Sequence, residues 1–286
     1  MKRMRLLIVA LVFASGCKPT SESIEPVTSG TAKAQQGYAA DSPVAGPEES
    51  VGTKSPSLLR EVRDANTKAA AGDARAAWRV VEIYEQCAQF ARSRADFDTD
   101  MKARGESSPV LARQLEVVRA EVRRRCDGLT AAEVSPDAVA AARSRALGMA
   151  SVPAMISSYA QKTLFDSPVD ALSVRKLVDL ARTSRDPEAM AALAPLMGEQ
   201  TESLRFELAP MPAGSKASEA AWLFAACRSG LDCSPRSSRV LDMCVNGGIN
   251  CELRDVESFY LQELLSPAEG KVARQLTNVI LNGKGD

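Results

Sequence analysis

The sequence predicts an all-α protein, a helix-hairpin array (α-solenoid-like or an irregular helical bundle) that follows a disordered N-terminal tether. From residue 58 onward, apolar residues recur at intervals of three and four, which places them on one face of successive helices. Ser–Pro and Asp–Pro pairs, which favour the first turn of a helix, recur along the same region. No strand alternation bounded by hairpin turns occurs, and a composition rich in Ala, Leu, Arg and Glu favours helices.

Two segments carry the clearest helical stripes. Asp73, which follows a turn at Gly72, is expected to cap a helix over residues 73–94, and a second helix is expected over residues 109–126. The chain between them is expected to form a loop of about 15 residues. Further helices are expected to start at Ser135–Pro136, Ser167–Pro168, Asp186–Pro187, Ser234–Pro235 and Ser266–Pro267.

The charge composition excludes several classes of function. The chain has 36 basic and 36 acidic residues and no histidine, so its formal net charge is zero. Without histidine, Ser-His-Asp and Cys-His catalysis and imidazole metal ligands are excluded. Balanced charge argues against nucleic-acid binding, which needs a basic excess. No P-loop, dinucleotide fingerprint or nucleophile elbow occurs, so we expect no cofactor and no catalytic residue of these types.

The first residues have the order of an export signal: basic residues, the apolar run Leu6–Phe13, and small residues up to Gly16. The run is too short to span a bilayer as a permanent helix. Its ending before Cys17 resembles the lipobox of bacterial lipoproteins, although Ala14 stands where that family usually has Leu. The resemblance implies that residues 1–16 are a signal peptide and that Cys17 is acylated. The alternative is an ordinary signal cleaved after Gly16, and both interpretations export the chain.

The region that follows the signal is expected to be a tether. Residues 17–57 would hold the lipid attachment site and a Pro-, Ser- and Gly-rich linker, and residues 58–286 would form the helical domain. A coil of about 40 residues spans about 35 Å. Lys18, where an Asp would favour inner-membrane retention, implies an outer-membrane anchor, with the protein facing the periplasm or exposed at the surface.

Weak internal repeats run through the helical domain. Four alanines, each followed by a large residue, are separated by multiples of a period near 35 residues. Small residues let two helices approach closely, so the pattern suits a helix-hairpin solenoid. The four positions are Ala76, Ala154, Ala189 and Ala220.

The segment Ala70–Glu85 resembles tetratricopeptide-like repeats, and most closely the exported, cysteine-bridged kind found in bacteria. This resemblance implies an α-solenoid whose concave face binds segments of other proteins. Trp78 and Trp222 hold equivalent repeat positions, and we expect both to be packing residues.

Six cysteines remain after Cys17, and an even number in an exported chain predicts disulfides. Cys87 and Cys126 lie on the apolar faces of the two clearest helices, so they can meet across a hairpin. The pairs Cys227–Cys233 and Cys244–Cys251 each flank a Gly-containing turn. Pairing Cys233 with Cys244 would join opposite ends of one helix, about 16 Å apart, where a disulfide needs roughly 7 Å. A zinc site is disfavoured because C-x₂-C pairs are absent, so we expect no metal.

Acidic and basic clusters are the remaining candidates for chemistry. Glu82 and Glu85 share the first strong helix, and paired carboxylates can act as acid and base. The triplet Asp96, Asp98 and Asp100 has the spacing of the start of a calcium loop, but the Gly and Glu that such a loop needs are missing, so a solvated loop is expected.

A basic run, Arg123–Arg125, is expected to oppose a helix dipole, and contact with lipid headgroups or peptidoglycan is the alternative.

Two functional hypotheses result. The first is a non-enzymatic envelope lipoprotein that offers its helical surface to an envelope protein partner, anchored to the membrane through its N-terminal lipid. The alternative is a cell-wall-associated carboxylate enzyme or a peptidoglycan-binding protein. Such an enzyme needs a cleft with aromatic side chains and two carboxylates at mechanistic spacing, and 5% aromatics make this unfavourable.

Overall fold

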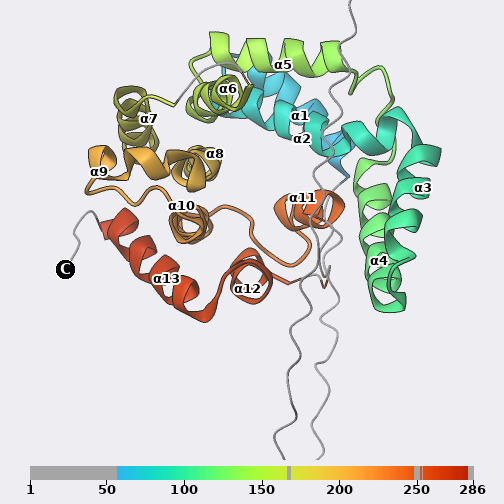
Figure 1. Cartoon of the computed structure of the whole chain (residues 1–286). Helices are drawn as coiled ribbons and strands as arrows, with labels where there is room; N and C mark the ends of the chain where they lie inside the picture. Colours follow the sequence, from blue (N-terminus) through green and yellow to red (C-terminus); the bar gives the residue numbers. More distant parts are fainter. Residues whose placement is uncertain (1–56, 166–168, 248–251, 253, 283–286) are drawn as a thin grey trace, which may run out of the picture. The chain divides into compact units, whose positions relative to one another are not determined.

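Figure 1 shows the computed structural model, which describes residues 57–165, 169–247, 252 and 254–282. The described residues form helices and turns without a strand, so the all-α prediction is confirmed. The predicted signal peptide, Cys17 and all but the last residue of the predicted tether lie outside the described residues. The helices are α1 (Leu58–Ala70), α2 (Ala74–Arg92), α3 (Arg94–Gly105), α4 (Pro109–Cys126), α5 (Pro136–Gly148), α6 (Val152–Phe165), α7 (Ala171–Ser184), α8 (Pro187–Leu193), η1 (Ala194–Met197), η2 (Glu199–Leu204), α9 (Arg205–Leu208), α10 (Lys216–Arg228), α11 (Ser238–Gly247), α12 (Val256–Phe259), η3 (Tyr260–Leu264) and α13 (Pro267–Asn282).

Five helices, α2, α4, α5, α8 and α13, begin where the sequence predicts. The carboxylate of Asp73 accepts hydrogen bonds from the backbone N–H groups of Arg75 and Ala76, both at 3.0 Å, and so caps α2. Helices α5, α8 and α13 start at the proline of the predicted Ser–Pro or Asp–Pro pair. The start predicted at Ser167–Pro168 lies outside the described residues.

One predicted start is wrong by a few residues. The helix expected from Ser234–Pro235 begins at Ser238, because Ser234 and Ser237 close a turn through a backbone hydrogen bond of 2.9 Å. The hydroxyl of Ser237 then caps α11 by accepting from the N–H of Val240 at 3.3 Å.

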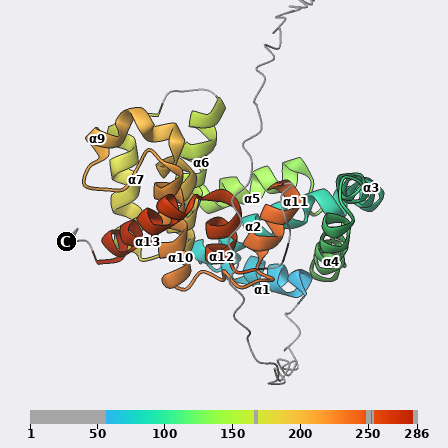
Figure 2. The same cartoon turned by 60° about the horizontal axis from the view of Figure 1, so that its bottom comes forward.

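The prediction of a loop between the two clearest helices is also wrong, because most of that segment forms helix α3. Phe97 and Met101, one helical turn apart, are buried, and the hydroxyl of Ser93 caps the helix by accepting from Asp96 N–H at 3.2 Å. Helices α3 and α4 lie side by side as a hairpin (Figure 2). Their approach is close at Gly105, where an added Cβ would meet the Cα of Ala112 at 2.9 Å.

The apolar core has two main clusters. The first cluster contains buried residues of the five helices α1, α2, α3, α4 and α5, and the second contains buried residues of α6, α7, α8, η1 and α10. In the second half, α6 packs on α8, α8 on α10 and α10 on α13 (Figure 1). The repeat alanines of α2, α6, α8 and α10 are all buried; those of α2 and α6 belong to the first cluster and that of α8 to the second. Small buried residues therefore recur where neighbouring helices pack, as a helix-hairpin array requires.

Helix α11 belongs to both clusters. Leu241 and Cys244 contribute to the first core, while Val240 contributes to the second. A short helix from late in the sequence thus packs against α4 and forms part of the surface beside α2.

Candidate functional site

Two disulfides brace the helices. Cys87 of α2 is bonded to Cys126 of α4, with their Cα atoms 5.5 Å apart, and Cys227 is bonded to Cys233 across the turn after α10. Both are pairs that the sequence predicts. The third predicted pair, Cys244–Cys251, cannot be followed because Cys251 lies outside the described residues, and Cys244 is buried in α11. Disulfides form in oxidising compartments, so these bonds indicate an exported protein.

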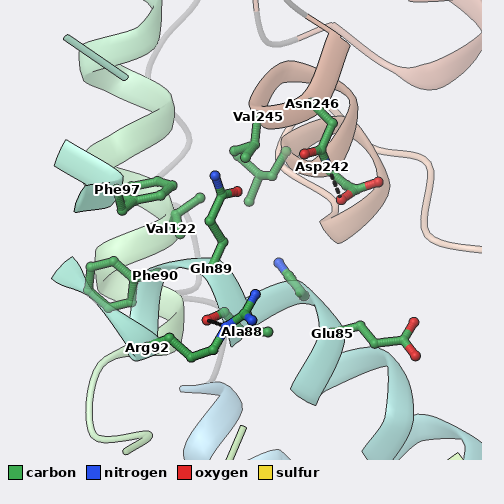
Figure 3. A pocket seen from close by; sticks show the side chains of 12 residues that line it. Glu85, Ala88, Gln89, Phe90, Arg92, Phe97, Val122, Asp242, Val245 and Asn246 are labelled. Atoms are coloured by element: carbon green, nitrogen blue, oxygen red, sulfur yellow. Dashed lines mark hydrogen bonds between the residues drawn. The ribbon is translucent and has the colours of Figure 1, made fainter. Parts of the chain in front are cut away.

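A cleft of about 390 Å³ opens where α2, α3, α4 and α11 meet (Figure 3). At the edge of this cleft, the Cys87–Cys126 disulfide holds α2 against α4. Its apolar lining includes Phe90, Phe97, Val122, Leu241 and Val245, and its polar lining is Glu85, Gln86, Gln89, Arg92, Asp242 and Asn246.

Three amide side chains face this cleft. Figure 3 shows Gln89 extending from α2 toward Val245 of α11. The Nδ2 of Asn246 donates a hydrogen bond to Oδ1 of Asp242 at 2.7 Å. The Nε2 of Gln86 is buried and has no hydrogen-bond partner among the described residues. A buried donor without a partner is costly, so Gln86 is a polar group that its neighbours in the fold leave unsatisfied.

The charged groups of the cleft are held locally. Glu85 accepts from Nε of Arg143 at 2.5 Å, and Nε of Arg92 donates to the carbonyl of Ala88 at 2.9 Å. Desolvation raises the pKa of Asp242, against smaller opposing effects of Arg239 and Asn246.

A second hollow of about 360 Å³ lies between α2 and α5 and is lined by Val134, Pro136 and Val139 among others. Glu85, Ala88 and Arg92 line both hollows, so the two lie next to each other along the C-terminal half of α2. We call the two hollows together the α2 groove.

Two buried or half-buried arginines hold α11 beside the groove. Nη2 of Arg104 in α3 donates to the carbonyl oxygen of Cys244 at 2.8 Å, and its Nη1 donates to that of Val245. Nη1 of Arg125 in α4 donates to the carbonyl of Arg236 at 2.8 Å, just before α11 begins. The two guanidinium groups thus donate to main-chain carbonyls and hold α11, the helix that carries Asp242 and Asn246, in place beside the groove.

The predicted basic run is divided between different partners. Arg123 pairs with Asp98 and Arg124 with Glu121, whereas Arg125 points inward to the segment before α11. The three arginines therefore do not form one shared basic surface.

The acidic candidates are separated in the same way. Asp98 lies on α3 and pairs with Arg119 and Arg123, and the calcium-like triplet is part of a helix. Within the described ranges, no three Cys, Asp or Glu side chains are grouped as metal ligands.

Glu82 is the most strongly perturbed acid. Burial, and then the nearby carboxyl of Glu188 in α8, raise the pKa of Glu82 to about 8. Nη1 of Arg79 lies 3.2 Å from Glu82, and Nη2 of Arg239 in α11 lies 3.6 Å from Glu188. This cluster joins α2, α8 and α11, but neither Glu82 nor Glu188 lines the α2 groove.

The two tryptophans are packing residues, as predicted. Trp222 is fully buried and its Nε1 donates to the carbonyl of Pro212 at 3.0 Å, while Trp78 is 7% exposed. The sequence did not reveal Gln89, Asp242 and Asn246 as site residues, because single polar residues on two distant helices carry no local pattern.

The chain matches no protein-family model, no curated protein and no solved structure. No helix in the described part of the chain is long and apolar enough to cross a membrane.

Proposed function

We propose that the chain is a non-enzymatic envelope lipoprotein that binds an extended segment of an envelope protein in the α2 groove. In this proposal Cys17 carries the lipid, and the helical domain faces the periplasm from the outer membrane. The helical array with buried small residues at repeat positions supports the likeness to tetratricopeptide-like repeats.

The observation that carries the proposal is the set of amide side chains in the groove. An amide offers both a donor and an acceptor, which match the C=O and N–H groups of an extended peptide backbone. Gln86, Gln89 and Asn246 line the cleft from α2 and α11. The two hollows share three lining residues of α2, so a long and narrow ligand that crosses this helix would contact both.

The Glu82–Glu188 pair is the observation that favours the enzymatic alternative, because acid–base chemistry needs a carboxyl with a raised pKa. The pair lies outside the groove, however, and its exposed fractions, 17% and 23% of the side chains, are small. In the groove, Phe90 and Phe97 are at most 2% exposed, so they offer no stacking face for a sugar ring. These features support a binding role over glycan hydrolysis.

Site-specific photocrosslinking in intact cells tests the proposal. A photoreactive phenylalanine analogue replaces Gln89 or Asn246 in the groove, and Lys271, exposed on α13, serves as the control position. We expect the two groove positions to crosslink the same envelope protein, while Lys271 does not. Loss of that product in a Gln86→Ala background would assign the contact to the groove.

The opposing outcome is equally specific. If the groove positions give no protein product and the purified protein is instead retained on cell-wall sacculi, the peptide-binding proposal is wrong and the glycan alternative stands.

The lipid anchor is tested separately by metabolic labelling with radioactive palmitate. We expect the wild-type chain to incorporate label and the Cys17→Ser variant not to, with the variant released into the soluble periplasmic fraction.

A further inference from the structure

One aromatic side chain on α9 is exposed to solvent. Phe206 is 78% exposed, whereas the other phenylalanine side chains that the structure describes are at most 3% exposed. Leu172, in the first turn of α7, is 62% exposed. These two are the most exposed large apolar residues of the described chain. A single exposed apolar residue is ordinary, whereas here the two most exposed ones lie on helices that contact each other.

The two elements are tied together. Helices α7 and α9 are in contact, and the guanidinium of Arg175 in α7 donates to the carbonyl oxygen of Glu207 in α9. The Arg205 guanidinium lies over the ring of Phe206, 4.5 Å from its centroid. Arg175 lies one turn after Leu172, so apolar and basic side chains alternate over the same face. We call this the α7–α9 surface.

The charge of this surface differs from that of the whole chain. Residues 170–185 and 205–207 hold five basic and three acidic residues, whereas the chain after residue 16 holds 33 basic and 36 acidic residues. Of the three acids, Asp170 is engaged at the start of α7, where it accepts from the N–H groups of Leu172 and Ser173. The others are Asp179 and Glu207. Basic residues outnumber acidic ones in these two segments, and Arg205 and Arg175 are the ones that contact the Phe206 ring and the neighbouring Glu207 backbone.

We propose that the α7–α9 surface is a second membrane contact, in which Phe206 and Leu172 enter the headgroup region of a bilayer that contains anionic lipid. Aromatic rings favour the membrane interface, and nearby Arg and Lys side chains gain from anionic headgroups. The proposal rests on the lipid anchor proposed above for its proximity to a membrane. The 40 residues from Cys17 to Pro56 reach at most about 140 Å when fully extended, so the anchor permits the contact.

The test uses the chain from residue 17 with Cys17→Ser, so that no acyl group can bind vesicles, and with Phe206→Trp as a fluorescent reporter. The control places the reporter at Val272→Trp, 43% exposed on α13. Vesicles are phosphatidylethanolamine–phosphatidylglycerol or phosphatidylcholine alone. We expect a blue shift of the Phe206→Trp emission with the anionic vesicles, a weaker one at high salt, and none for Val272→Trp.

Sedimentation with the same vesicles gives a measure that needs no reporter. Because the double variant removes both apolar side chains that would enter the headgroup region, Phe206→Ser with Leu172→Ser should lower partition at least tenfold. Val272→Ser should leave it unchanged.

Three outcomes would overturn the proposal. They are no shift with either vesicle, an equal shift for the Val272→Trp control, and a shift without lipid that grows with protein concentration, which would assign the surface to a second copy of the chain. Since groove crosslinking does not depend on Phe206, failure here leaves the proposed function intact, and the palmitate experiment separates loss of the anchor from loss of this contact.

Discussion

Cys87 of α2 is covalently joined to Cys126 of α4, with a Cα–Cα distance of 5.5 Å, and both residues are fully buried. The bond sits between two groove-lining neighbours of Cys87, Gln86 and Ala88, and one helical turn beyond the groove residue Val122. It therefore holds two walls of the α2 groove at a fixed separation. The third wall, α11, depends on non-covalent contacts with Arg104 and Arg125.

Removal of this disulfide should cost more stability than removal of the other one. The Cys87–Cys126 bond spans 39 residues and the Cys227–Cys233 bond only 6. By the loop-entropy relation, the double alanine variants should lose about 4 and about 2 kcal/mol of unfolding free energy, respectively. Guanidinium unfolding followed by circular dichroism measures both. A larger loss from the Cys227→Ala/Cys233→Ala variant would contradict the expected order.

Glu82 should make the fold less stable at alkaline pH. Its pKa is about 8 in the folded chain and 4.5 ordinarily, so the folded state binds a proton that the unfolded state releases in this window. The free energy of unfolding should fall as pH rises from 4.5 to 8, by up to about 1.4 kcal/mol per pH unit, and level off above 8.

The Glu82→Gln variant isolates this effect. Because Gln does not titrate, the variant should show a flatter stability profile between pH 4.5 and 8 than the wild-type chain. Glu116→Gln, at an exposed position of α4, is the matched control and should keep the wild-type profile. Urea unfolding midpoints at a series of pH values provide the measurement. Parallel profiles for the wild-type chain and Glu82→Gln would show that Glu82 does not cause the pH dependence of stability.

The helices were predictable because their signals are local. Ser–Pro and Asp–Pro pairs mark several starts, and the stripes that contain Cys87 and Cys126 also predict their disulfide. Helix α3 was missed because only Phe97 and Met101 are buried and apolar in an otherwise polar segment, so the stripe is too short to recognise.

The groove was not predictable, since it depends on tertiary contacts without a sequence pattern. Gln89 and Asn246 line the same cleft only because α11 lies where α2, α3 and α4 meet, and that position uses side-chain-to-backbone bonds such as Arg104 to the Cys244 carbonyl. Every residue type carries a backbone carbonyl, so the sequence does not reveal which carbonyl will accept a hydrogen bond from a distant side chain. Glu188 beside Glu82 is a similar case, because α8 is far from α2 in the sequence.

Arg104 should control how firmly α11 is held. Replacing it by Met removes the donors to the carbonyls of Cys244 and Val245, at an expected cost of about 2 kcal/mol. Backbone amides of α11 should exchange faster with deuterium, and crosslinking from Asn246 should fall. The comparison is Arg113→Met, exposed on α4, for which we expect no change in α11. Unchanged exchange in Arg104→Met would show that other contacts position the helix.

The two tryptophans should respond differently to loss of the indole N–H. Trp222 donates to the carbonyl of Pro212 at 3.0 Å in a fully buried site. The Trp222→Phe variant therefore leaves that carbonyl without its donor and also creates a cavity. The Nε1 of Trp78 is buried without a hydrogen-bond partner among the described residues, so Trp78→Phe removes packing but no hydrogen bond. We expect Trp222→Phe to cost at least about 1 kcal/mol more, measured by urea unfolding of both variants. An equal cost would mean that the Pro212 contact contributes nothing and that both rings act through packing alone.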